Sequence, residues 1–167
     1  MISGEAITLE LGQPFPDLDL PDHTGRPRLL SEVAGGDPVA LVFFRGFWCP
    51  KEQRYMRALV GTQEEFEVAY ARLVAVSVDS PEVQSAFRAG LGARFVFLSD
   101  AERRWLEPLG LLEAEDTVHQ PYRPTVLTLF PDLTVHAVYR GDWFWGRATM
   151  EELRQDMRAI THAVREG

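Results

Sequence analysis

The chain has 167 residues, 46% of them hydrophobic and 25% charged, which is typical of a globular domain with a core of its own. Its formal net charge of −8 argues against nucleic acid or an anionic membrane surface as a partner, because both attract basic patches. The single cysteine excludes a disulfide within these residues and favours a reducing, cytoplasmic location.

The N-terminal residues Met1 to Ala6 lack the basic start and apolar core of a signal peptide, so no leader is expected. No apolar run approaches the ~20 residues that cross a bilayer, so no membrane span is expected either.

The first third of the chain predicts short elements separated by glycine and proline. Residues 7–11 alternate weakly and predict a short strand, and the breaker-rich residues 12–17 follow it. Residues 18–26 predict a strand that ends in an Asp-x-x-Gly turn, and residues 27–33 predict a short helical turn.

Strands and helices are predicted to alternate through the middle of the chain. Residues 39–44 form a continuous apolar run, typical of a strand buried on both faces. A helix is expected to begin after Cys49 because Pro50 suits the first helical position, and Gly61-Thr62 is a candidate interruption of it. Next come a predicted strand at 73–78, a helix at 83–90 started by Ser80-Pro81, a strand at 95–98, and a helix from the cap Ser99-Asp100 to about Leu109. A loop-rich stretch is expected at 111–123, followed by a hairpin of strands 125–130 and 134–139. An aromatic loop at 141–146 then leads to a last helix, which the capping box Thr149–Glu152 opens.

Such alternation implies parallel strands joined by crossover helices, and the hairpin implies an antiparallel edge. There is no internal repeat, linker or low-complexity segment. We therefore expect one mixed α/β domain over residues 1–167.

Cys49 lies where the buried strand gives way to the helix. The first N–H groups of a helix lack intrahelical partners, and its dipole adds partial positive charge there. Both favour the thiolate, which is the nucleophilic form of cysteine. The alternative is a buried and inert cysteine, which is common, but the position favours a reactive thiol.

Two segments carry a resemblance to a known family. Trp48-Cys49-Pro50 after an apolar strand resembles the thioredoxin superfamily, and Cys49-Pro-Lys-Glu52 is similar to the Cys-Pro-x-Glu of peroxiredoxins, in the alkyl hydroperoxide reductase and thiol-specific antioxidant branch. Tyr122-Arg123-Pro124-Thr125 before a strand resembles the segment with that branch's arginine and the thioredoxin cis-proline. The resemblance extends from about residue 11 to about residue 163. It implies an α/β, thioredoxin-like (redoxin) fold, with a central mixed sheet flanked by helices and an N-terminal β-hairpin extension.

The resemblance implies a thiol peroxidase with one catalytic cysteine and no cofactor. Cys49 would attack hydrogen peroxide or an alkyl hydroperoxide and become a sulfenic acid. An external thiol, either thioredoxin-like or of low molecular weight, would then have to resolve it, because the sequence has no second cysteine.

The resemblance also implies roles for other residues. Arg123 would stabilise the thiolate and the charge on the leaving oxygen, since a guanidinium is always charged and presents several donors. Arg45, four residues before Cys49, is a rival for that role. Glu52 would orient the arginine, and Pro124, if cis, would present backbone beside the thiol. The structural alternatives are a surface arginine and a solvated carboxylate in the first helical turn.

Aromatic residues gather near the thiol and in the loop at 141–146. Trp48 would bind substrate by lining an apolar peroxide pocket, together with Phe47, Trp143, Phe144 and Trp145; packing or a homodimer contact is the favoured alternative. The four histidines, His23, His119, His136 and His162, show no metal-ligand spacing, and no metal site is expected.

The sequence departs from the family pattern at two positions before the thiol. Gly46 stands three residues before Cys49, where the substrate-orienting Thr or Ser is usual, and Val42 stands seven before, where Pro is usual. Glu52 occupies the place of the second cysteine of a C-x-x-C motif. These departures keep two other functions open, a non-catalytic thioredoxin-fold binding module and a monothiol–disulfide exchange protein.

Overall fold

The computed structural model describes residues 7–143 and 145–167. Its elements in chain order are β1 (Asp19–Pro21), β2 (Pro27–Leu29), α1 (Leu30–Ala34), β3 (Val39–Phe43), α2 (Pro50–Val68), β4 (Arg72–Ser77), α3 (Pro81–Leu91), β5 (Val96–Ser99), β6 (Thr125–Leu129), β7 (Val135–Arg140) and α4 (Met150–Glu166). In this part of the chain no helix is both long and apolar enough to cross a membrane.

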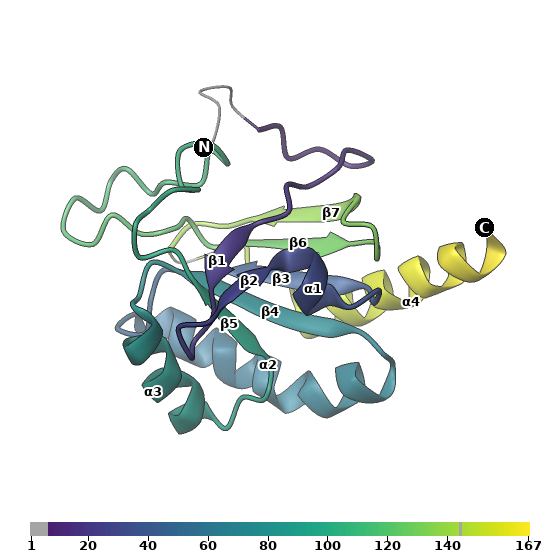
Figure 1. The fold of residues 1–167 in the computed structure, drawn as a ribbon, viewed down its shortest axis with the longest axis horizontal. Helices are drawn as coiled ribbons and strands as arrows, with labels where there is room; N and C mark the ends of the chain where they lie inside the picture. Colours follow the sequence, from purple (N-terminus) through teal and green to yellow (C-terminus); the bar gives the residue numbers. More distant parts are fainter. Residues whose placement is uncertain (1–6, 144) are drawn as a thin grey trace.

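The central sheet has the strand order β5-β4-β3-β6-β7, with the buried strand β3 in the middle (Figure 1). β4 runs parallel to β3 and β5 parallel to β4, whereas β6 is antiparallel to both β3 and β7. β1 and β2 form a separate antiparallel hairpin near the N-terminus. The expected mixed sheet and N-terminal hairpin are therefore confirmed.

Alternate residues of β3 serve two different cores. Val39, Leu41 and Phe43 pack against the N-terminal elements, α1 and the segment around Trp105. Ala40 and Val42 face the opposite core, formed with α2, α3 and α4. Because successive side chains of a strand point to opposite faces, an unbroken apolar run is what a strand covered on both sides requires.

Local signals account for most of the element ends. Ser80 accepts a hydrogen bond from the Val83 backbone N–H at the start of α3, and Thr149 and Glu152 form the expected capping box of α4. Helix α2 runs through Gly61-Thr62 without a break, contrary to expectation. There the Thr62 hydroxyl donates to the Leu59 carbonyl, which satisfies it within the helix.

The short helical turn expected within residues 27–33 is present as α1, which follows β2 directly. Two expectations at other positions were wrong. Residues 7–11 form no strand; instead the Ile7 N–H donates to the Pro108 carbonyl. No helix follows Ser99-Asp100, although the Asp100 carboxylate does accept N–H bonds from Arg104 and Trp105. Arg103 adopts φ 56°, which cannot continue a right-handed helix.

Candidate active site

Cys49 lies at the junction between sheet and helix. The loop after β3 leads to it, and it is the N-cap of α2 with extended backbone angles, followed by Pro50 in the first helical turn. Its side chain is buried, with 2% of its surface exposed. The Cys49 N–H donates to the Gly46 carbonyl at 3.3 Å, and the Cys49 carbonyl accepts from the Gln53 N–H at 2.9 Å. The thiol therefore occupies the helix start predicted from sequence.

Arg45 is the cation that contacts the thiol. Its Nη1 lies 3.5 Å from Cys49 Sγ, within hydrogen-bond distance for sulfur. The Arg45 backbone N–H donates to Glu52 Oε2 at 2.6 Å, so the first turn of α2 fixes the chain that carries this arginine. The guanidinium also lies over the Trp48 ring, with Cζ 4.8 Å from the ring centroid. The structure brings together Cys49, Arg45, Glu52 and Trp48.

Two carboxylates from a distant loop bind the other side of Arg45. Glu113 Oε2 accepts from Arg45 Nε and Asp116 Oδ2 accepts from Nη2, both at 2.7 Å. Burial lowers the pKa of Arg45, but the hydrogen bonds that it donates to Glu113 and Cys49 outweigh burial and hold that pKa above its ordinary value. The pKa of the Asp116 carboxyl lies below its ordinary value, mainly because this group accepts a hydrogen bond from the His119 backbone N–H. Asp116 is therefore an anion at neutral pH.

Glu52 is buried, with 1% of its side chain exposed, and pairs with an arginine that sequence analysis did not single out. Arg147 Nε lies 2.6 Å from Glu52 Oε1, and Arg147 Nη2 donates to the Trp143 carbonyl. Burial raises the pKa of Glu52, while the charge of Arg147 and the Arg45 N–H partly offset it. The solvated carboxylate considered as an alternative is thereby excluded.

Gly46 and Trp48 share one small space. Gly46 has φ 153°, and a Cβ added there would lie 2.4 Å from Trp48 Nε1, closer than real contacts allow. The Trp48 ring stacks on His119 with the ring centroids 3.7 Å apart and the planes at 14°. His119 Nδ1 in turn lies 3.0 Å from Asp116 Oδ2. The indole thus occupies the place where a side chain at residue 46 would be.

Arg123 and Pro124 lie at the same end of the sheet without joining this network. Phe43 pairs with Thr125, so Arg45 and Arg123 each lie two residues beyond that pair. The Arg123 side chain is exposed, whereas its backbone N–H donates to the Leu111 carbonyl. Pro124 is buried, and in the described residues every peptide bond is trans, including the one before Pro124. The structure therefore records no side-chain contact of Arg123 with the thiol among the described residues.

Further contacts fix the turn that precedes the thiol. Asp79, two residues after β4, accepts the Phe47 backbone N–H at 3.1 Å, and the Gln53 amide donates to the Phe47 carbonyl at 2.7 Å. The Phe47, Trp143 and Trp145 side chains are exposed by 42%, 52% and 70%, so they do not form a closed pocket wall. Phe144 lies outside the described residues.

Sequence reasoning missed four residues of the network, namely Arg147, Glu113, Asp116 and His119. The last three come from the stretch that was expected only to be loop-rich, and no spacing in it marks them as partners of Arg45 or Trp48. Over the described ranges 7–143 and 145–167, no group of three or more His, Cys, Asp or Glu side chains could hold a metal ion.

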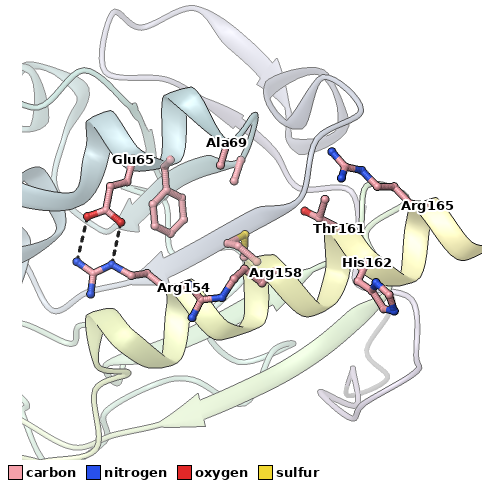
Figure 2. A pocket seen from close by; sticks show the side chains of 10 residues that line it. Glu65, Ala69, Arg154, Arg158, Thr161, His162 and Arg165 are labelled. Carbon is pink, nitrogen blue, oxygen red and sulfur yellow. Dashed lines mark hydrogen bonds and ion pairs between the residues drawn. The ribbon is translucent and has the colours of Figure 1, made fainter.

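A cavity of about 410 Å³ lies away from the thiol, between α4 and the later turns of α2 (Figure 2). Phe66 and Met157 line it, and Arg154 and Glu65 pair across it. Phe66 follows Cys49 by 17 positions along α2, which places it about 25 Å away at 1.5 Å per residue. None of the site residues lines this cavity, so it is separate from the thiol.

Comparisons with known proteins agree with the geometry. The model of the AhpC/TSA family matches residues 11–138. A Mycobacterium tuberculosis protein with the provisional name of a peroxiredoxin is 26% identical over 162 residues, covering 95% of this chain and all of the relative.

Solved structures share the fold. The peroxidoxin BcpB of Mycobacterium tuberculosis has a TM-score of 0.77 at 21% identity, covering 93% of this chain and 98% of its own. The AhpC of Enterococcus faecalis has a TM-score of 0.79 at 16% identity, covering 95% and 96%. Yeast mitochondrial 1-Cys peroxiredoxin has a TM-score of 0.79 at 16% identity, covering 96% and 80%. With the family model spanning more than half of its length and a thiol at the start of α2, the chain belongs to the AhpC/TSA family and is a peroxidase of the peroxiredoxin type.

Proposed function

We propose that the chain is a one-cysteine peroxidase in which Cys49 carries the reaction and Arg45 stabilises its charge. The observation that carries the proposal is the 3.5 Å contact between Arg45 Nη1 and Cys49 Sγ at the N-cap of α2. The helix start and the guanidinium both favour a negative charge on sulfur. The expected role of Arg123 passes to Arg45, because the Arg123 side chain is exposed.

In the first step, the Cys49 thiolate attacks one oxygen of a hydroperoxide. A sulfur–oxygen bond forms, the O–O bond breaks, and the second oxygen leaves with the bonding pair and takes up a proton as water or an alcohol. Cys49 is oxidised to a sulfenic acid and the peroxide is reduced. The negative charge moves from sulfur to the leaving oxygen, and Arg45 lies where it can interact with both.

Trp48 supplies the donor that Gly46 lacks. The side-chain space at Gly46 is filled by the indole, with Nε1 as its nearest atom. An indole N–H is a donor only, so it can hydrogen-bond a peroxide oxygen but cannot accept from the substrate as a hydroxyl does. Arg45 and His119 both contact the ring, which favours one fixed direction for the N–H.

Glu52 positions Arg45 in this proposal. It binds the Arg45 backbone N–H with one oxygen and Arg147 with the other. Pro124 is buried at the same end of the sheet and contributes to the shape of the site through packing.

Hydrogen peroxide and alkyl hydroperoxides are the proposed substrates, and a thiol from another molecule is the proposed reductant. The sequence contains one cysteine, so the resolving sulfur cannot be a second cysteine of these residues. The solved structure of yeast mitochondrial 1-Cys peroxiredoxin concerns thiol resolution through glutathione and thioredoxin systems. We extend that chemistry to this chain, with either a thioredoxin-like protein or a small thiol as the reductant.

The test is mass spectrometry of the protein after one equivalent of hydrogen peroxide, with dimedone present to trap sulfenic acid. We expect a dimedone adduct on Cys49 that forms much faster than on free cysteine. No adduct, or oxidation as slow as that of free cysteine, would refute the proposal. Turnover of glutathione mixed disulfides without peroxide reduction would instead favour a monothiol exchange protein.

A further inference from the structure

Residues 113–119 lie against the thiol site through three separate contacts. Glu113 and Asp116 bind Arg45, and His119 stacks on Trp48, the residue next to Cys49. The carboxylates expose only 10% and 15% of their side chains. We call this stretch the cover segment. It contains no helix or strand, and its three contacts with the site are all made by side chains.

The cover segment competes with the thiolate for Arg45. The guanidinium donates through Nε to Glu113, through Nη2 to Asp116 and through Nη1 to Cys49. One positive charge is therefore shared by two carboxylates, and a thiolate adds a third anion. Like charges at such distances disfavour each other when the site is partly buried. If the carboxylates move away from Arg45, the thiolate becomes the anion with which the guanidinium interacts most strongly.

Access to Cys49 is narrow, and the cover segment holds two of the residues beside it, Arg45 and Trp48. Cys49 is 2% exposed in this arrangement, which is too little for the sulfur of a large thiol to reach it. Resolution requires a thiolate to attack the Cys49 sulfenic acid, which forms a mixed disulfide and expels hydroxide that takes up a proton to become water. A second reductant thiolate then attacks the reductant sulfur of that mixed disulfide, so that the two reductant thiols are joined in a disulfide and Cys49 leaves as a thiolate. Both attacks need a path to the sulfur under attack that is wide enough for the reductant. The reaction with peroxide needs a narrower path, because hydrogen peroxide is a much smaller molecule.

We infer that Glu113 and Asp116 are positioning residues that latch the cover segment to Arg45, and that this latch limits which thiols can reach Cys49. The inference rests on the function proposed for Cys49. With the latch closed, small peroxides react and bulky thiols are slowed; with the latch released, Cys49 becomes both more accessible and more nucleophilic.

The test compares two thiol reagents of different size on the full chain without peroxide. One is iodoacetamide, and the other is a maleimide joined to a polyethylene glycol chain. The test variant is Glu113→Gln/Asp116→Asn, which keeps the side-chain shapes and removes both charges. The charge control is Glu115→Gln in the same segment, whose side chain is exposed. The variant Glu113→Asp/Asp116→Glu retains both charges as a conservative rescue.

In Glu113→Gln/Asp116→Asn we expect modification by iodoacetamide to be roughly tenfold faster, because the positive charge of Arg45 is no longer shared with two carboxylates and stabilises the thiolate more. The gain with the bulky maleimide should be larger still, so the ratio of the two rates rises. The control should match the wild type, and the rescue variant should return toward it. An unchanged ratio, or slower reaction with both reagents, would overturn the inference. Sulfenic acid trapping of the wild type tests the proposed function separately, because alkylation does not require peroxide chemistry.

Discussion

Arg45 Nη1 and Cys49 Sγ are 3.5 Å apart across the turn that joins β3 to α2. The backbone N–H of the same arginine is bound by Glu52, three residues after the cysteine. The thiol proposed to react and its cation are thus fixed to the same helix start, and we expect a change in either to alter the rate of peroxide reduction.

Replacing Arg45 should affect peroxide reduction more than replacing Arg123. For Arg45→Gln we expect kcat/KM for hydrogen peroxide to fall by about 10²–10³, the usual effect of losing a group that stabilises developing charge. Arg45→Lys should fall between this variant and the wild type, because an ammonium lacks the planar fork that binds three partners here. Steady-state peroxidase kinetics would measure both.

Arg123→Gln is the matched control, since it also removes one positive charge at this end of the sheet. Its side chain is exposed, and we expect kcat/KM within a few-fold of the wild type. If Arg123→Gln were the more damaging change, the assignment of the charge-stabilising role to Arg45 would be wrong.

Trp48→Phe should reduce the rate of the peroxide step without reducing the reactivity of the thiol toward iodoacetamide. The phenyl ring retains much of the contact with Arg45 and His119 but has no N–H. Loss of one neutral hydrogen bond of about 1–1.5 kcal/mol corresponds to roughly a tenfold fall in kcat/KM. Stopped-flow oxidation and alkylation rates would be compared. Parallel falls in both would indicate a packing role alone.

Removing one partner of the buried pair of Glu52 and Arg147 should lower the stability of the protein strongly. Arg147→Met leaves a buried carboxylate without its cation, and we expect a loss of about 3–5 kcal/mol in the free energy of unfolding. Because burial raises the pKa of Glu52, this loss should increase as pH rises and the carboxyl ionises. Urea denaturation at several pH values would measure it.

Arg158→Met provides a surface comparison for the buried pair. Arg158 binds Glu151 at 3.2 Å with 67% of its side chain exposed, so its replacement should cost at most about 1 kcal/mol. Adding Glu52→Gln to Arg147→Met should recover part of the stability. Equal effects of the buried and the exposed substitution would contradict this account.

Asp22 should make stability depend on pH in the acid range. Burial opposes its ionisation, but hydrogen bonds from Thr24, Arg28 and Arg26 prevail and lower the pKa of Asp22 to about 2. A carboxyl with a lowered folded pKa stabilises the protein above its unfolded pKa of ~3.9, and this contribution is lost as pH falls toward 2. Asp22→Asn should cost about 1–3 kcal/mol at neutral pH.

The measurement is urea denaturation of wild type and Asp22→Asn between neutral pH and pH 2. The two curves should converge as the pH falls. Asp19→Asn is the control on the same hairpin, because Asp19 is exposed and pairs with Arg104 at the surface. A stability difference that stays constant down to pH 2 would refute the linkage.

The sequence predicts the framework of the molecule well where one local rule dominates. The apolar run at β3, the capping box of α4 and the thiol before Pro50 were all found from residue type and spacing. The helix expected after Asp100 failed despite its cap, because Arg103 takes a left-handed conformation that spacing does not reveal. Apolar periodicity and a cap therefore do not establish a helix when one residue leaves the helical region.

The arginine partner of the thiol was harder to predict. Arg45 and Arg123 flank the same pair of strand residues, and in loops no periodicity determines which way a side chain points. Glu113 and Asp116 bind the Arg45 guanidinium in the fold, yet they are distant from it in the sequence, 68 and 71 positions along the chain. Such long-range pairs leave no local pattern.

The Gly46 backbone has a consequence for engineering. Introducing threonine there, to match the usual family pattern, would force a β-branched residue to φ 153° and drive its Cβ into the indole of Trp48. A side chain at residue 46 and the present position of the Trp48 indole are therefore mutually exclusive in this turn. A hydroxyl residue at position 46 therefore requires a second substitution at Trp48 that clears the space for it.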